Sequence, residues 1–298
     1  MRIVECKWAT ADIGRKRIIF SLKNENGNEA FGEISPYPSL NQESSDEAFK
    51  QLKSVIPLLK TDLSKIKTLD LFPSVAFGIK SALWQLIDPL PHFSCPFSAL
   101  LCGSMSEIYI QAEKALSLGI KSAKIKIGSL SIDDAKEAVD ALKSKFHLRI
   151  DLNQKWETAQ VFHFFSSYSE QDFDYIEDPL KDPKELVSFP LPFAVDARPD
   201  SELSLQMKSL VVKPTILKQF PEIKKPIVLS SCFDTGLNIF HLAALAKKLS
   251  LALPQGFGPY LFLKQDVLDH PLVIRDGLLQ IPKIIHLDKK LYASLSHF

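Results

Sequence analysis

The chain has 298 residues and a formal net charge of +1 at pH 7. Its composition, 46% hydrophobic and 24% charged, is typical of a globular protein with one large domain or two unequal ones. The near-neutral charge without a long basic run argues against nucleic-acid binding, and the lack of an apolar run of about 18 residues argues against a membrane-spanning protein.

The first residues, Met1–Cys6, lack the apolar core of a secretory signal, so we expect a cytoplasmic protein. The four cysteines, Cys6, Cys95, Cys102 and Cys232, form no CxxC pair and have no histidine at zinc-like spacing. We therefore predict reduced, mostly buried thiols, with neither a disulfide framework nor a zinc site.

The first 95 residues predict a small α+β domain. Residues 17–23 and 29–33 are expected strands, and the segment 24–28 between them contains Asn-Gly, which favours a tight turn. With the residues before them they form a three-stranded antiparallel meander. Helical patterns follow over 45–59 and 73–87.

Beyond residue 95 the pattern changes to short apolar strands that alternate with helical stretches, which predicts a closed parallel α/β barrel over 96–260. The predicted strands are 108–111, 122–127, 148–153, 173–178, 192–196, 210–213, 227–231 and 250–253. The close spacing after the fourth and fifth strands predicts abbreviated helices there. We expect the tail, 261–298, to carry a hairpin at 273–278 and to return to the first domain.

Lys124 and Lys126 share one face of the predicted strand 122–127, because successive side chains of a strand point to opposite faces. Two buried cations need anions nearby. The ends of the next three strands supply them at Asp151, Glu177 and Asp196, each flanked by Ile or Val residues that point the other way. The sequence therefore predicts three carboxylates on one rim of the barrel.

Carboxylate oxygens suit Mg²⁺, with Mn²⁺ as the alternative ion. Lys213 follows the next strand and is expected across the metal from the first lysine pair. A metal that stabilises an enediolate, beside a lysine base whose pKa is lowered by burial and cationic neighbours, suits removal of a proton α to a carboxylate. We thus expect a small-molecule carboxylate as substrate.

This order of Lys-x-Lys, Asp, Glu, Asp and Lys resembles the enolase superfamily. Within it the chain is most similar to the o-succinylbenzoate synthases, on the residues Gly32–Pro36, Arg149–Asn153, Val212–Thr215 and Val228–Ser231. The resemblance implies a modified TIM barrel, (β/α)7β, with an α+β N-terminal capping domain completed by the C-terminal tail. It also implies a Mg²⁺-dependent dehydration in menaquinone biosynthesis.

Carried over by position, the resemblance makes Asp151, Glu177 and Asp196 the metal ligands. Lys126 would be the base and then the acid of a syn elimination. Lys124 would hold Lys126 and lower its pKa, while Lys213 would stabilise the anion from the opposite face. The resemblance further implies contacts to substrate or to the groups around the metal from Arg149, Asn153, Ser230 and Ser231.

Other functions stay open from the sequence. An N-succinylamino acid racemase would use the same metal and opposed lysines, and a non-catalytic ligand-binding barrel would keep the fold without turnover. Dipeptide epimerases and muconate cycloisomerases fit less well, the former because Ser230–Asp234 contains no Asp-x-Asp. Ala197 follows Asp196 where related sequences commonly have Glu, which could loosen the groups around the metal.

Overall fold

The computed structural model describes residues 1–197, 206–219 and 224–298. The chain begins with β1 (Ile3–Asp12), β2 (Lys16–Asn24) and β3 (Glu29–Ile34), which form the predicted antiparallel meander. The expected Asn-Gly turn is confirmed, since Gly27 has φ +82° and the Asn24 side chain accepts hydrogen bonds from the backbone of the turn.

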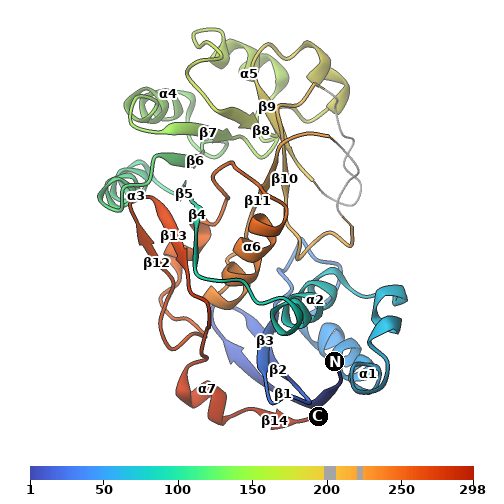
Figure 1. Cartoon of the computed structure of the whole chain (residues 1–298). Helices are drawn as coiled ribbons and strands as arrows, with labels where there is room; N and C mark the ends of the chain where they lie inside the picture. The colour runs from blue at the N-terminus through green and yellow to red at the C-terminus, as the bar shows by residue number, and fades with distance from the viewer. Residues whose placement is uncertain (198–205, 220–223) are drawn as a thin grey trace.

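The two predicted helices cover this meander, and a 3-10 turn that was not predicted lies between them in the chain (Figure 1). They are α1 (Ser45–Thr61), η1 (Leu63–Thr68) and α2 (Pro73–Ile87). Helix α1 begins at a capping box in which Ser44 and Glu47 exchange hydrogen bonds. Its buried side chains, Leu52, Val55 and Leu59 among them, lie at helical spacing and pack in a core of their own with β1–β3 and α2.

A seven-stranded parallel sheet forms most of the predicted barrel, with the strands in the order β11-β10-β9-β8-β7-β6-β5. Its strands are β5 (Ser98–Leu101), β6 (Ser122–Lys126), β7 (His147–Asp151), β8 (Tyr175–Glu177), β9 (Phe193–Asp196), β10 (Ser209–Val212) and β11 (Ile227–Leu229). Helices α3 (Met105–Ser117), α4 (Ile132–Leu142) and α5 (Thr158–Phe165) connect successive strands, and α6 (Gly236–Lys248) follows the last strand, β11. The modified TIM-barrel class is thereby confirmed.

The predicted eighth strand over 250–253 is wrong. After α6 the chain is irregular, and the eighth position is taken by Gln255 and Gly256 alone, which form parallel bridges to Phe97 and Ser230. Backbone hydrogen bonds from Gln255 to Pro96 and from Gly256 to Leu229 close the barrel between β5 and β11.

The predicted first strand over 108–111 is also wrong, because these residues lie inside α3. Ser104 and Glu107 form a capping box that starts a helix, and Ile108, Ala112 and Ala115 recur at helical spacing and are buried. The barrel instead begins at β5, a four-residue run that is buried throughout.

The helix predicted to be short after the fourth strand is confirmed as the 3-10 turn η2 (Pro183–Ser188). The connection after β9, also predicted to be abbreviated, includes residues 198–205, which lie outside the described residues. Between β5 and β9 the strand alternation holds: Ile125 and Ile150 face the helices, while Lys124 and Arg149 face the barrel interior.

After Gly256 the chain forms η3 (Gly258–Phe262), the hairpin β12 (Val273–Arg275) and β13 (Leu278–Ile281), α7 (Lys289–Ala293) and β14 (Ser296–His297). The hairpin adds to β4 (Phe93–Pro96), and β14 pairs with β1 at the edge of the first sheet. The end of the tail thus reaches the capping domain, whereas the hairpin joins β4, which spans the predicted boundary. The division into a capping domain over 1–95, a barrel over 96–260 and a returning tail over 261–298 stays a prediction.

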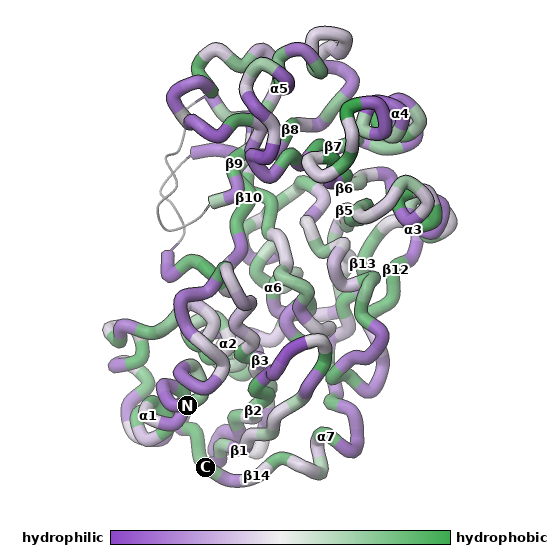
Figure 2. The backbone as a smooth tube through the Cα atoms, turned by 180° about the vertical axis from the view of Figure 1, so that it is seen from behind, coloured by the Kyte–Doolittle hydropathy of each residue, from purple (hydrophilic) through white to green (hydrophobic). Residues whose placement is uncertain are grey.

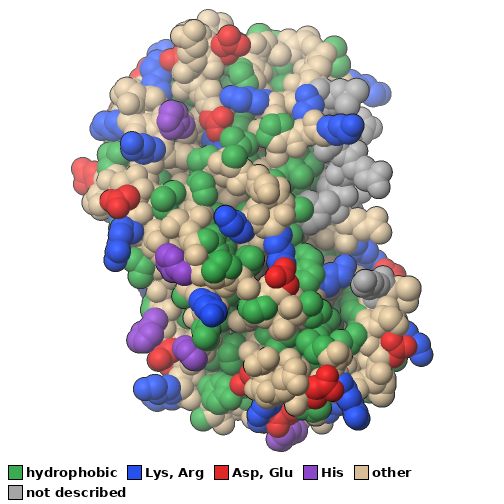
Figure 3. Space-filling view, in the orientation of Figure 1, with side chains coloured by type: hydrophobic (Ala, Val, Ile, Leu, Met, Phe, Trp, Pro, Cys, Tyr) green, Lys and Arg blue, Asp and Glu red, His purple; other side chains and the backbone are tan. Residues whose placement is uncertain are grey.

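Helix α6 lies between the capping domain and the parallel strands in both views of the backbone (Figures 1 and 2). Ten of its thirteen residues are buried, and it contacts β3 of the capping domain. Among the described residues no helix is long and apolar enough to cross a membrane. Basic and acidic side chains are interspersed over the face shown in Figure 3.

Candidate active site

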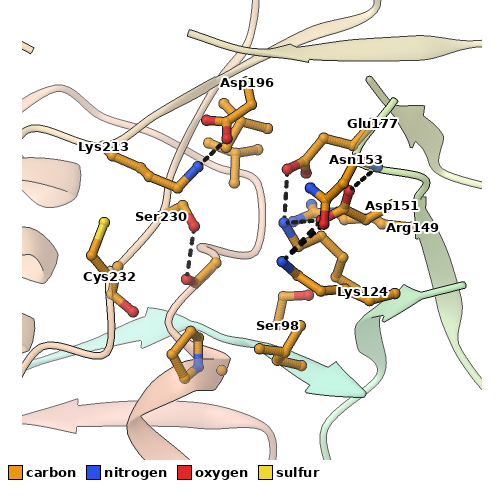
Figure 4. Close-up of a pocket in the computed structure, with 18 of the residues that line it drawn as sticks. Ser98, Lys124, Arg149, Asp151, Asn153, Glu177, Asp196, Lys213, Ser230 and Cys232 are labelled. Carbon is orange, nitrogen blue, oxygen red and sulfur yellow. Dashed lines mark hydrogen bonds and ion pairs between the residues drawn. The ribbon is translucent and has the colours of Figure 1, made fainter. Parts of the chain in front are cut away.

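The predicted site residues line one cavity of about 280 Å³, which opens where the parallel strands end (Figure 4). The lining includes Lys124, Lys126, Arg149, Asp151, Asn153, Glu177, Asp196, Lys213, Ser230 and Ser231. Residues scattered over more than a hundred positions are thus brought together by the barrel, because the carboxyl ends of its strands all meet on one face.

Strand register places the central groups side by side. Lys126 pairs with Asp151 across β6 and β7, and Asp151 pairs with Glu177 across β7 and β8. One position further round the barrel, Asp196 lies opposite Val211 of β10. The carboxylates predicted from three separate strand ends therefore occupy three consecutive strands.

Lys124 lies beneath the first two carboxylates. Its Nζ is 2.7 Å from Glu177 Oε1 and 3.1 Å from Asp151 Oδ2. Lys126 Nζ is 3.7 Å from Asp151 Oδ2 and donates a hydrogen bond to Asn153 Oδ1 at 3.3 Å. With 40% of its side chain exposed, Lys126 is the freer of the two amines and the one that faces the cavity opening.

On the opposite wall, Lys213 donates a hydrogen bond to Asp196 Oδ2, and Ser230 and Cys232 lie beside it (Figure 4). The side chains of Lys213 and Asp196 are 12% and 11% exposed. The cavity therefore has a cation on each of two facing walls, as the sequence predicts.

The charges inside the barrel set the protonation of these groups. Burial alone would lower the pKa of Lys124, but the charges of Asp151 and Glu177 outweigh it and raise that pKa well above its ordinary value. The pKa of Lys213 is raised in the same way, by Asp196 against burial. Both lysines are held protonated by the neighbouring protein groups, contrary to the lowering that burial by itself predicts.

The carboxylates respond in opposite directions. Burial raises the pKa of Asp151, but Lys124 and Lys126 outweigh it, so the net direction is downward. Burial also raises the pKa of Glu177; Lys124 opposes this, whereas Asp151 and Asp196 add to it, and the pKa stays above the ordinary value. Neighbouring negative charges thus remain incompletely balanced at Glu177.

This donor set fits a hard divalent cation. All candidate ligands are carboxylates, and buried Asp151 Oδ2 accepts no well-directed hydrogen bond although two lysine amines are near. Within the described ranges no three acidic, His or Cys side chains converge closely enough to hold one ion as they stand. An ion held by these strands would take carboxylate oxygens that now face Lys124 and Lys213.

Two protein-family models match the chain, and they agree with its fold. Residues 13–86 match the family model described as MenC, N-terminal domain, and residues 107–190 match the model described as enolase C-terminal domain-like. The two matches follow each other in the order of the capping domain and the barrel. The chain belongs to the enolase superfamily.

Individual members of the enolase superfamily resemble the chain over most of its length. An o-succinylbenzoate synthase from Proteus mirabilis is 27% identical over 289 residues, covering 85% of this chain and 87% of that protein. Another from Vibrio cholerae is 27% identical and covers 76% of each chain.

Solved structures support the fold of this superfamily member. The L-Ala-D/L-Glu epimerase from Bacillus subtilis superposes with a TM-score of 0.77 at 16% identity, over 96% of this chain and 99% of that one. This likeness establishes the fold alone.

Arg149, a predicted substrate contact of this enolase-superfamily site, is held mainly by other groups of the protein. Arg149 is 1% exposed and donates hydrogen bonds to Asp174 Oδ2 and to the Pro254 carbonyl, both at 2.8 Å. Its guanidinium also lies over the Tyr175 ring, 4.9 Å from the ring centroid. Only its Nη2, which has no hydrogen-bond partner in the described chain, is left for a ligand.

The other predicted contacts differ among themselves. Asn153 takes the left-handed conformation (φ +47°), and its backbone N–H donates to Asp151 Oδ1, which orients that carboxylate. Ser230 Oγ donates to the Gly256 carbonyl at 3.3 Å. Ser231 Oγ is buried and has no hydrogen-bond partner in the part of the chain that the structure describes.

Sequence reasoning missed the apolar side of the cavity. Tyr37 and Leu40 reach it from the capping domain, Phe233 from the loop after β11, and Pro259 from η3. Their positions depend on how distant segments meet, so no local spacing could have revealed them. A local signal was the pair of prolines that flank Tyr37 at positions 36 and 38, which indicates a loop.

Asp178 is a further missed residue. Its Oδ1 accepts a hydrogen bond from the Asp196 backbone at 3.0 Å, and its carbonyl accepts one from the Gln154 backbone at 3.2 Å. It is buried in the left-handed conformation (φ +46°), and burial together with Glu177 raises its pKa to about 7. Asp178 thus ties the ends of β7, β8 and β9 together.

Proposed function

We propose that the chain is an o-succinylbenzoate synthase, a cytoplasmic carbon–oxygen lyase of menaquinone biosynthesis. It would convert 2-succinyl-6-hydroxy-2,4-cyclohexadiene-1-carboxylate to o-succinylbenzoate and water. The observation that carries the proposal is the placement of Lys126 and Lys213 on facing walls of a cavity that also holds three carboxylates. The similarity to o-succinylbenzoate synthases over most of the chain supports the choice of substrate.

Asp151, Glu177 and Asp196 would hold Mg²⁺, or Mn²⁺ in its place. When bound, the cation neutralises the negative charge that develops on the substrate carboxylate as its α proton leaves. Carboxylates engaged by that cation would hold the lysine amines less tightly, which would lower the cost of a neutral amine in the cavity.

Lys126 is proposed to move the protons. Its amine takes the proton α to the carboxylate, and the resulting ammonium gives a proton to the hydroxyl on the neighbouring carbon, which departs as water on the same face. The ring becomes aromatic in this step. Lys124 is anchored between Asp151 and Glu177 and thereby fixes the position of β6, the strand that carries Lys126.

Lys213 is proposed to remain protonated over the other face of the ring. Asp196 holds its amine, and the raised pKa keeps its positive charge available for the delocalised anion. Asn153, Ser230, Ser231 and the free Nη2 of Arg149 are proposed substrate contacts, while the apolar wall accommodates the ring.

The test is an absorbance assay with Mg²⁺ and the cyclohexadiene substrate. We expect aromatisation with the intact chain and its loss with Lys126→Ala. Lys121→Ala is the matched control, because Lys121 is exposed just before the opposite end of β6. Absence of turnover by the intact, Mg²⁺-supplied protein would reject the synthase.

The facing lysines also suit an N-succinylamino acid racemase, which exchanges a proton between two faces of one carbon. Solvent deuterium exchange into N-succinyl amino acids tests this second activity separately. Incorporation that requires both Lys126 and Lys213 would add racemisation to the proposed function. A binding barrel without turnover would fail both assays while retaining affinity for the carboxylate product.

A further inference from the structure

Phe233 forms part of the cavity wall in a strained backbone conformation. Its φ of +54° lies in the left-handed region, which bulky side chains rarely adopt, and such strain persists only where surrounding contacts enforce it. Its ring stacks on Tyr37 of the capping domain, with 6.1 Å between centroids and 22° between planes. Both rings line the cavity.

The capping domain supplies the hydrogen bonds to the Phe233 carbonyl, while Asp234 Oδ2 accepts one from the Cys232 backbone within the turn at 2.8 Å. Arg17, 1% exposed on β2, donates from Nη2 to the Phe233 carbonyl at 2.7 Å. The same guanidinium donates from Nη1 to Glu33 Oε1 at 2.6 Å and from Nε to the Ile13 carbonyl at 3.0 Å. One rigid fork therefore joins the β1–β2 turn, β3 and the cavity wall.

Glu33, the acidic member of this ion pair, also binds the barrel. It is fully buried, and its Oε2 accepts hydrogen bonds from Thr235 Oγ1 and, at 3.3 Å, from the Asn238 backbone at the start of α6. Both carboxylate oxygens are thus used, one toward Arg17 and one toward the turn that follows Phe233. The buried pair therefore holds the turn on both flanks, and Arg15 adds a further hydrogen bond from Nη1 to the Phe233 carbonyl at 3.1 Å.

We propose that Arg17, together with Glu33, is a positioning residue that fixes the Phe233 wall of the cavity and thereby sets substrate affinity. This inference rests on the proposed function for its kinetic consequence. Arg17 touches neither the lysines nor the carboxylates that line the cavity, so its loss should affect binding of the apolar part of the substrate more than proton transfer.

The first test is Arg17→Lys, which keeps the charge beside Glu33 but cannot reproduce the planar three-way fork. We expect KM to rise about 10-fold and kcat to change less than about 3-fold. Lys16→Met is the matched control, because Lys16 neighbours Arg17 but is exposed and pairs with Asp46 on α1. Unchanged KM in a folded Arg17→Lys protein would overturn the proposal.

A second measurement does not depend on substrate. Cys232 directly precedes Phe233 and is 4% exposed, so its alkylation in the native protein, quantified by mass spectrometry, reports loosening of this turn. We expect about 10-fold faster labelling of Cys232 in Arg17→Lys, with Cys6 and Cys95 unchanged. These two buried thiols lie elsewhere and would react together with Cys232 only if the variant unfolded globally.

Thr235→Val supplies the answer if Arg17→Lys does not fold, because it removes only the hydroxyl bound to Glu33. Faster labelling of Cys232 alone would support the positioning role, and labelling equal to that of the unmodified chain would reject it. If the intact protein shows no turnover, the proposed function fails while the labelling result still decides whether Arg17 and Glu33 hold the wall.

Discussion

The amine of Lys124 lies 2.7 Å from Glu177 Oε1, joining β6 to the second strand beyond it. Asp151, on the strand between them, approaches the same amine at 3.1 Å. A single cation therefore already bridges two carboxylates that are proposed to bind a metal. The lysine and a divalent ion would share these oxygens, so the site is built around positive charge.

Removing one of these carboxylates should weaken the metal site. We expect Asp151→Asn or Glu177→Gln to reduce Mg²⁺ affinity about 10-fold or more, because each removes a charged oxygen donor. Titration calorimetry on the folded proteins provides the measurement. Asp133→Asn, an exposed change at the start of α4, should leave the affinity unaltered, and equal affinity in all three variants would reject the ligand assignment.

Gly128 allows the chain after β6 to pass close to the chain after β7. A Cβ at this position would lie 2.2 Å from the Leu152 carbonyl oxygen, a backbone atom that cannot move alone. We expect Gly128→Ala to lower the free energy of unfolding by roughly 1–3 kcal/mol or more, as overpacking does, and to reduce turnover by displacing Asn153 from Lys126.

Denaturant unfolding of Gly128→Ala should be compared with that of Gly14→Ala. Gly14 has φ +69°, but a Cβ added there would have no atom within 4 Å, so only backbone strain of about 1 kcal/mol is expected. A smaller loss at position 128 than at position 14 would contradict the close-approach argument.

His241 should make stability depend on pH. It is buried on α6 with Nε2 bonded to the Phe31 carbonyl at 2.9 Å, and burial lowers its pKa to about 4 from 6.5. Above pH 6.5 the imidazole is neutral in both states. As the pH falls from 6.5 to 4, only the unfolded chain takes up the proton, so stability is lost by roughly 3 kcal/mol in total.

Urea unfolding at pH 7 and pH 5 can isolate this contribution. We expect His241→Gln to show about 2 kcal/mol less loss over that interval than the unmodified chain. His270→Gln is the control, since that ring is 91% exposed. Identical pH dependence in the unmodified and His241→Gln proteins would show that His241 does not stay neutral on folding.

Gln255 substitutes for part of the missing eighth strand. It is fully buried, and its Oε1 accepts a hydrogen bond from the Leu229 backbone at 2.7 Å. We expect Gln255→Ala to cost about 1–3 kcal/mol of unfolding free energy, because it leaves that N–H unsatisfied. Thermal unfolding should show the loss, and an exposed change, Gln171→Ala, should not.

The central site could be predicted because its information is local. Alternation within Ser122–Ile127 fixes which side of the strand Lys124 and Lys126 occupy. The same rule points Asp151 and Glu177 into the barrel at the ends of their strands. All of them line the cavity. Their metal-binding and catalytic roles remain predictions to be tested by the variants above.

The remaining features depend on tertiary contacts. A strand at Ile108 was predicted from a short apolar run, but the capping box at Ser104 commits this segment to a helix. The eighth strand was expected at 250–253, whereas the structure has only the bridges of Gln255 and Gly256 at this position. The buried side chain of Gln255 supplies a hydrogen bond that a longer strand would make. Tyr37 and Phe233 meet only when the capping domain docks on the barrel.

The bridge between Phe97 and Gln255 has a consequence for the order of folding. These residues are separated by more than half of the chain, and every lysine and carboxylate of the proposed site lies in the segment that they enclose. During synthesis the cavity cannot acquire its final shape until residue 255 has left the ribosome. Closing so long a loop is slow, so catalytic competence should be among the last properties that the nascent chain gains.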